Sequence, residues 1–135
     1  MQAMASEGTE VIAGGISDPV FGPVVLFGAG GTAAEVWQDR AVALAPISAS
    51  RAAQLVCETK VHTLLAGYRG APAADMDALA DVLVRVSALL DAHPEVCELD
   101  LNPLIAGPDG VQIVDARCRL APSTTRSGVA ARSLD

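Results

Sequence analysis

The chain of 135 residues has nine Lys and Arg residues against sixteen Asp and Glu residues, a formal net charge of −7 at pH 7. This balance argues against a nucleic-acid partner, because binding to phosphate backbones requires clustered basic side chains. The length suits one domain, and no uncharged stretch reaches the roughly 20 apolar residues that a membrane helix needs. With no visible secretory signal and three cysteines without CxxC spacing, we expect a cytoplasmic protein with reduced thiols.

The first part of the chain is predicted to form short strands with tight turns. Residues 9–46 are rich in Val, Ile, Gly and Pro and show little helical periodicity. We expect strands at 9–16, 23–28, 34–39 and 42–47, after a disordered N-terminus at 1–7.

Two helices are predicted next. Ser48 or Ser50 is a suitable N-cap for a helix that runs to about Ala66 and ends at Gly67. Asp75 is the expected N-cap of a second helix, which the dipeptide at 93–94, His-Pro, stops. The apolar stripe of the second helix consists of Met76, Leu79, Ala80, Leu83, Val86 and Leu90.

Two further strands, at about 95–106 and 111–118, are joined by a Gly-Pro-Asp-Gly turn. The tail at 121–135 has no apolar periodicity and is expected to be disordered. Strands, two helices and a hairpin in this order predict an α+β fold, with helices packed on a mainly antiparallel sheet.

The segment CELDLNPL (97–104) places Glu98, Asp100 and Asn102 at every second position, and therefore on one face of an extended strand. If the turn is a four-residue loop, Asn102 lies directly opposite Asp115, with Cβ atoms about 5 Å apart. A two-residue loop at Asp109 and Gly110 would leave the pair diagonal on the same face, whereas a three-residue loop would swap the faces and separate the pair. Mixed carboxylate and amide oxygens suit hard cations such as Mg²⁺, so the pair predicts a site for one ion.

Asp115 shares its predicted face with Val111 and Ile113, and a partly buried carboxylate needs a compensating partner. A metal ion is one such partner. Alternatively, Arg117 can compensate the Asp115 carboxylate as a plain ion pair, or this face of the sheet can be solvated. The pattern does not decide between these two interpretations and the metal site.

Four motifs resemble those of a known family in order and spacing: DPVFGPVVLFGAGG (18–31), LLAGYRG (64–70), ELDLNPL (98–104) and VDAR (114–117). Over roughly residues 8–120, the chain resembles the C-terminal subdomain of the ATP-grasp domain of NDP-forming (ADP-forming) acyl-CoA synthetases, which are related to the succinyl-CoA synthetase β subunit. The resemblance implies that Asn102 and Asp115 are Mg²⁺ ligands for the phosphates of ATP or ADP, and GTP is equally compatible. It also implies that Asp100 is catalytic and lies near a phosphohistidine during phosphoryl transfer.

The same resemblance implies partners in the same or a separate chain: the N-terminal ATP-grasp half, which supplies a phosphate-gripping lysine, and the CoA-binding and ligase domains. The chain is then a fragment, a split subunit or a decayed remnant, and we expect it to be inactive alone. The alternative is a non-catalytic interaction or regulatory module that retains the scaffold, since half a cleft would be left exposed.

The remaining candidates are the glycine-rich segment, Arg69, and the acidic pair Glu35 and Asp39. FGAGG (27–31) can cradle an anion or form a tight connection between strands. Arg69 can reach a phosphate or CoA, or belong to a helix C-cap turn with Tyr68 packed inward. Glu35 and Asp39 are expected on a solvated strand face.

Overall fold

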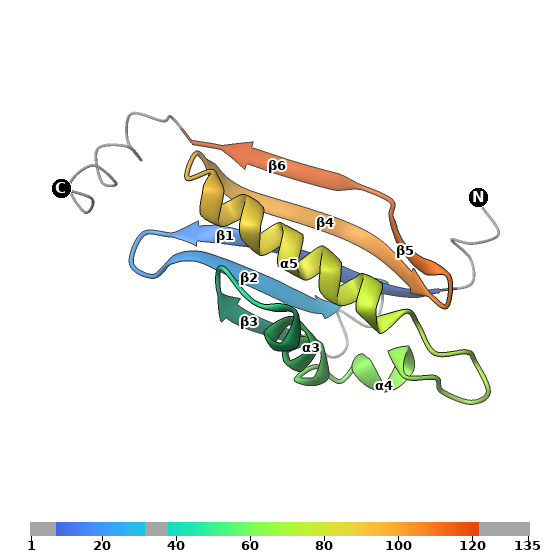
Figure 1. Ribbon diagram of the computed structural model, residues 1–135. Helices are drawn as coiled ribbons and strands as arrows, with labels where there is room; N and C mark the ends of the chain where they lie inside the picture. The colour runs from blue at the N-terminus through green and yellow to red at the C-terminus, as the bar shows by residue number, and fades with distance from the viewer. Residues whose placement is uncertain (1–7, 32–37, 122–135) are drawn as a thin grey trace.

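The computed structural model describes residues 8–31 and 38–121, which form one antiparallel sheet with helices on one of its faces (Figure 1). In these residues the sheet has six strands in the order β3-β2-β1-β4-β5, and β6 also pairs with β4. All the pairings are antiparallel. The strands are β1 (Thr9–Asp18), β2 (Gly22–Ala29), β3 (Arg40–Leu44), β4 (Val96–Gly107), β5 (Gly110–Ile113) and β6 (Ala116–Leu120). The predicted α+β fold is confirmed.

Three helices occur in the described residues: α3 (Ala49–Cys57), α4 (His62–Leu65) and α5 (Met76–Ala92). Figure 1 shows α5 lying across the sheet over β1 and β2, and α3 packs against α5. The core between helices and sheet is aliphatic, and its largest fully buried side chains include Phe27, Leu55, Leu79, Leu83 and Leu104. The opposite face of the sheet is covered by no helix of the described chain.

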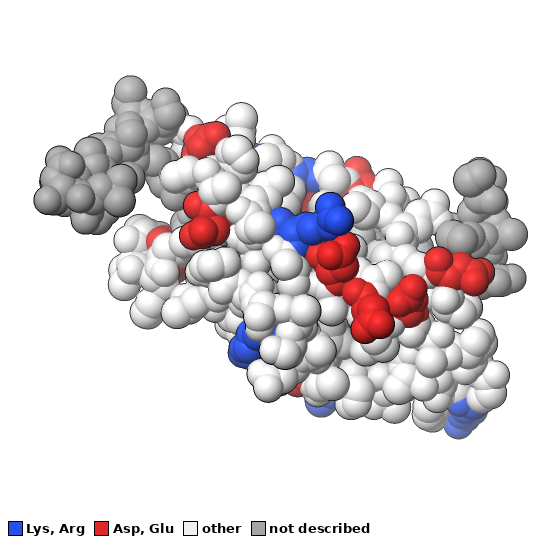
Figure 2. All heavy atoms as spheres, viewed as in Figure 1, with Lys and Arg blue, Asp and Glu red and all other residues white. Residues whose placement is uncertain are grey.

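Helix α5 follows its prediction closely. The Asp75 side chain caps it by accepting a hydrogen bond from the backbone N–H of Ala78 at 3.0 Å. The predicted stripe lies against the sheet, with five of its members buried and Met76 half-buried. Asp77, Asp81 and Arg85 face solvent as expected, and Figure 2 shows acidic side chains gathered over this helix.

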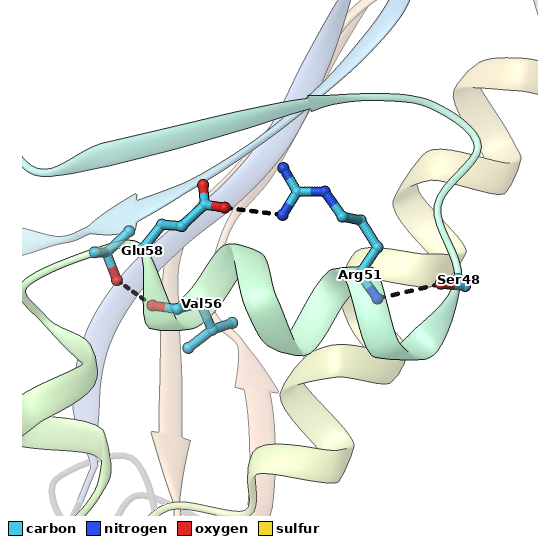
Figure 3. A network of polar contacts seen from close by, with 5 residues as sticks. Ser48, Arg51, Val56 and Glu58 are labelled. Atoms are coloured by element: carbon cyan, nitrogen blue, oxygen red, sulfur yellow. Dashed lines mark hydrogen bonds and ion pairs between the residues drawn. The ribbon is translucent and has the colours of Figure 1, made fainter.

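The first predicted helix is divided, so its expected extension to Ala66 is wrong. Ser48 is the N-cap and accepts from the backbone N–H of Arg51 at 3.1 Å, and the Arg51 side chain pairs with Glu58 at 2.9 Å (Figure 3). Beyond Glu58, the N–H groups of Lys60 and Val61 donate to the Asp39 carboxylate at 2.8 and 2.7 Å. Because these amides bond to Asp39, α3 stops and α4 begins as a separate turn.

Asp39 therefore does not lie on a solvated strand face, and that expectation is wrong. Its exposed fraction is 8%, and both carboxylate oxygens accept hydrogen bonds from the segment between α3 and α4. The carboxylate is stabilised by backbone donors, which is the usual requirement for a buried charge.

Several predictions lie wholly or mostly outside the described residues. These are the disordered N-terminus at 1–7, the tail at 121–135 except its first residue, the strand at 34–39 except its last two residues, and the exposure of Glu35. Among the helices that are described, none is long and apolar enough to cross a membrane.

Candidate functional site

The polar residues of β4 face the uncovered side of the sheet, as the sequence predicts. Leu101 is buried in the core, and Leu99 packs against it. Glu98, Asp100 and Asn102 instead line a hollow on the opposite face, of about 290 Å³. The alternation of strand β4 therefore places two carboxylates and an amide in one cavity.

Strand register brings apolar side chains beside these polar groups. Across the sheet, Ile16 on β1 pairs with Glu98, and Gly14 pairs with Asp100. On their other side the same two residues pair with Val24 and Leu26 of β2. Directly opposed residues share a face, so the hollow is apolar over β1 and β2 and acidic over β4. Its other lining residues are Ile12, Ala13, Gly15, Arg40, Val42 and Leu99.

Gly14 holds β1 and β4 close together beneath the hollow. A Cβ added to Gly14 would lie 2.1 Å from the carbonyl oxygen of Leu99 and 3.2 Å from the Cα of Asp100. Backbone atoms cannot move aside as a flexible side chain can, so this position requires glycine. The close approach sets the position of Asp100 relative to β1.

The hairpin register counted from the turn is confirmed. Gly107 pairs with Gly110 and Leu104 with Ile113, and β6 continues the same register, with Leu101 opposite Ala116. Between these pairs, the backbone N–H of Asn102 donates to the carbonyl oxygen of Asp115 at 3.1 Å. The structure thus brings Asn102 and Asp115 together, as predicted.

The strands are irregular at this point. The predicted strand at 111–118 is interrupted between β5 and β6, at Val114 and Asp115, and the pairing of β1 with β4 shifts register between Val11 and Ala13. As a result Leu101 and Leu104 both contribute to the core, although strict alternation would put them on opposite faces. Asn102 lines the hollow and stays exposed to solvent.

The Asp115 side chain is less buried than expected. Val111 packs against the core, but the exposed fraction of the Asp115 side chain is 54%. One carboxylate oxygen accepts from the N–H of Ala116 at 2.9 Å, and the other lies 3.8 Å from Nε of Arg117. Asp115 is therefore at the rim of the site rather than in the lining of the hollow.

The donors at this site fit a hard cation. No group of three His, Cys, Asp or Glu side chains suited to a metal occurs in residues 8–31 and 38–121. The set formed by Asn102 and Asp115 has one amide and one carboxylate, with Asp100 two residues along β4. Mg²⁺ commonly takes one or two protein oxygens and completes its shell with phosphates and water, so such a small set is suitable.

Arg40 is a site residue that the sequence prediction missed. It begins β3, opposite Gly28 of β2, and lines the hollow with Val42. The alternation of Arg40, Val42 and Leu44 was the available signal, since β-strand periodicity puts all three on one face. Arg40 brings a positive charge into an otherwise apolar and acidic cavity.

Backbone amides of the glycine-rich segment FGAGG (27–31) donate hydrogen bonds to neighbouring parts of the chain. The N–H of Ala29 donates to the carbonyl oxygen of Asp39, and that of Gly30 to the carbonyl oxygen of Glu10, both at 3.0 Å. At Gly28, an added Cβ would lie 2.4 Å from the Asp39 carbonyl oxygen. These contacts favour a tight connection over an anion cradle.

Tyr68 is not packed inward, so that expectation is wrong. The exposed fraction of Tyr68 is 46%, and the guanidinium carbon of Arg69 lies 5.4 Å from the centre of its ring. The pair is a cation–π contact at the surface.

Comparison with protein families matches residues 1–120 to the ATP-grasp domain. Acetate–CoA ligase [ADP-forming] I of Archaeoglobus fulgidus is 45% identical over 117 residues, which cover 87% of this chain and 17% of the relative. The β subunit of the corresponding ligase I of Pyrococcus furiosus is 44% identical over 110 residues, which cover 82% of this chain and 47% of the relative.

A solved structure shares the fold. It is the dinucleotide-forming acetyl-coenzyme A synthetase 1 of Ca. Korarchaeum cryptofilum, in complex with coenzyme A and Mg-AMPPCP, with its phosphohistidine segment pointing towards the nucleotide binding site. The TM-score is 0.81 at 41% sequence identity, over 84% of this chain and 54% of that chain. The chain thus spans about half the length of the β subunit and of the solved structure that it matches, and about a sixth of the length of the Archaeoglobus fulgidus ligase.

Proposed function

Because the chain belongs to the ATP-grasp domain family, and is homologous to part of ADP-forming acyl-CoA synthetases, we propose that it supplies the metal and phosphate side of their nucleotide site. The observation that carries the proposal is the juxtaposition of Asn102 and Asp115 at the edge of a hollow that also contains Asp100. The relatives are named as ligases or synthetases, which favours this function over a non-catalytic module.

Asn102 and Asp115 would hold the Mg²⁺ ion, one through its amide oxygen and the other through its carboxylate. When bound, the ion neutralises charge on the nucleotide phosphates and aligns them for transfer. The apolar part of the hollow, over Leu26 and Val42, would lie beside the phosphates, and water would be excluded from it only once the other half of the enzyme covers it.

Asp100 has a different role in the proposal. It faces the same hollow as Asn102, lies two residues from it along β4, and is directly opposite Arg117 of β6. From this position its carboxylate would accept a hydrogen bond from the N–H of an incoming carrier histidine, and so orient that ring towards the phosphoryl group. The carrier segment, the CoA site and the other nucleotide-binding half would come from the rest of the enzyme.

Calorimetric titration with Mg-ATP tests the proposal. The 135-residue chain alone should bind weakly, and affinity should rise when the part of the Pyrococcus furiosus β subunit that the chain does not match is added. The double substitution Asn102→Ala with Asp115→Ala should abolish the gain, whereas Asp109→Ala, in the exposed hairpin turn, should retain it. Unchanged affinity in the double variant would show that the metal site is elsewhere.

A further inference from the structure

Two arginines project from the edge strand β6 beside the carboxylates of β4. In the strand register, Arg117 lies directly opposite Asp100, and Arg119 lies directly opposite Glu98. These four residues and Cys118 line a second hollow of about 280 Å³. Since Glu98 and Asp100 also line the first hollow, the two cavities are neighbours on the uncovered face.

The two arginines differ in how firmly they are held. Nε of Arg119 donates to the Glu98 carboxylate at 3.2 Å. Nε of Arg117 lies 3.8 Å from the Asp115 carboxylate, which is too long for a hydrogen bond, and its side chain is 82% exposed. Arg117 is therefore a loosely held cation between two carboxylates, Asp115 along the chain and Asp100 across the ladder.

We propose that Arg117 neutralises Asp115 in the metal-free protein and binds the phosphate oxygens of a polyphosphate ligand once a divalent cation occupies Asp115. This inference rests on the proposed function, because it assumes that Asp115 is a metal ligand. The guanidinium and the cation compete for the same carboxylate and repel each other, so metal binding frees Arg117. The freed guanidinium has five N–H donors in a planar fork that matches phosphate oxygens.

The alternative is that Arg117 only stabilises the edge strand. A structural role predicts that removing the side chain weakens metal and phosphate binding together, or changes neither. The proposed exchange predicts opposite signs, because loss of a competing positive charge favours the metal, whereas loss of a donor disfavours the phosphate. The two titrations below therefore separate the two roles.

Two probes are needed, both used with the full chain. In the first titration Mn²⁺ alone is added, and electron paramagnetic resonance measures the concentration of free Mn²⁺. In the second, the preformed Mn²⁺–tripolyphosphate complex is titrated by calorimetry, because this ligand has phosphates but no nucleotide base. Arg117→Gln should bind Mn²⁺ about threefold more tightly, by removal of like charge. It should bind Mn²⁺–tripolyphosphate about tenfold more weakly, by loss of charged hydrogen bonds. Arg117→Lys should match the wild type for Mn²⁺ and restore part of the tripolyphosphate affinity.

Arg119→Gln is the matched control, because it removes the same charge from the same strand while Arg119 is paired with Glu98. Its effects on both probes should be smaller than those of Arg117→Gln. Two outcomes would overturn the role of Arg117 but leave the metal site standing. One is that Arg117→Gln and Arg119→Gln have equal effects on both probes. The other is that Arg117→Gln behaves like the wild type while Asp115→Ala loses Mn²⁺ binding. If the wild type fails to bind Mn²⁺, or Asp115→Ala binds it equally well, the proposed metal site falls, and the inference with it.

Discussion

The backbone N–H of Asn102 donates a hydrogen bond to the carbonyl oxygen of Asp115, with 3.1 Å between the two atoms. Thirteen positions separate these residues in the chain, and the hairpin between them returns Asp115 to the strand that carries Asn102 and Asp100. This hydrogen bond therefore ties the link between β5 and β6 to β4 at the position of the two proposed metal ligands.

A single substitution can distinguish the proposed role of Asp100 in phosphoryl transfer from metal binding. Asp100→Asn keeps the size of the side chain but removes its charge, so we expect Mg-ATP affinity within about twofold of the wild type. Phosphoryl transfer to the carrier histidine should slow about 100-fold, the usual scale for one positioned acid or base. Transfer of radiolabelled phosphate from ATP, in the complex reconstituted with the rest of a related enzyme, measures this rate.

Glu98→Gln is the control for that substitution, because Glu98 is on the same face but already paired with Arg119. It should slow transfer less than Asp100→Asn does. A slowing as large in Glu98→Gln would mean that the charge of the strand matters, and not the position of Asp100.

Gly14→Ala should distort the site from beneath. The added Cβ would meet the backbone of Leu99, and we expect the free energy of unfolding to fall by about 1–3 kcal/mol, as for other overpacked positions. Amide chemical shifts in β4 should change most near Asp100. Gly22→Ala is the control, because its added Cβ meets nothing within 4 Å and only its φ of +81° introduces strain. It should leave the amide chemical shifts of β4 unchanged.

Asp39→Ala should be among the more destabilising single changes in the chain. It leaves the N–H groups of Lys60 and Val61 without their acceptor, and we expect a loss of about 3 kcal/mol in the free energy of unfolding. Asp39→Asn keeps one acceptor oxygen and should cost less. Urea denaturation measures both, with Asp109→Ala as an exposed control; equal midpoints for Asp39→Ala and this control would contradict the proposed role of the buried carboxylate.

Asp18 makes the turn between β1 and β2 sensitive to acid. Hydrogen bonds from the backbone N–H groups of Phe21 and Val20 lower the pKa of Asp18 below its ordinary value of 3.8. A carboxyl whose pKa is depressed by folding stabilises the protein fully above 3.8, and this contribution disappears as the pH falls through the lower, folded-state pKa.

The difference in unfolding midpoint between the wild type and Asp18→Ala should therefore be constant at neutral pH and shrink below pH 3.8. Urea denaturation at a series of pH values checks this. A difference that stays constant down to pH 2 would show that the carboxylate form does not hold the turn.

Local periodicity was sufficient to predict much of this protein. The cap at Asp75 and the apolar stripe of α5 depend on neighbours within four residues, and the face shared by Glu98 and Asp100 depends on strand alternation alone. The short turn at Gly107–Gly110 fixes the hairpin register, which is why Asn102 and Asp115 could be paired by counting.

The remaining features required the tertiary structure, because each depends on contacts between segments far apart in the chain. Asp39 ends helix α3 by accepting the amides of Lys60 and Val61, about twenty residues later. Arg40 enters the hollow because β3 joins the sheet beside β2, and the shift between β1 and β4 puts Leu101 and Leu104 on the same side. Periodicity within one strand carries no information on which strands become neighbours, so the sequence by itself determined the polar face, and only the packing of the sheet decided what surrounds it.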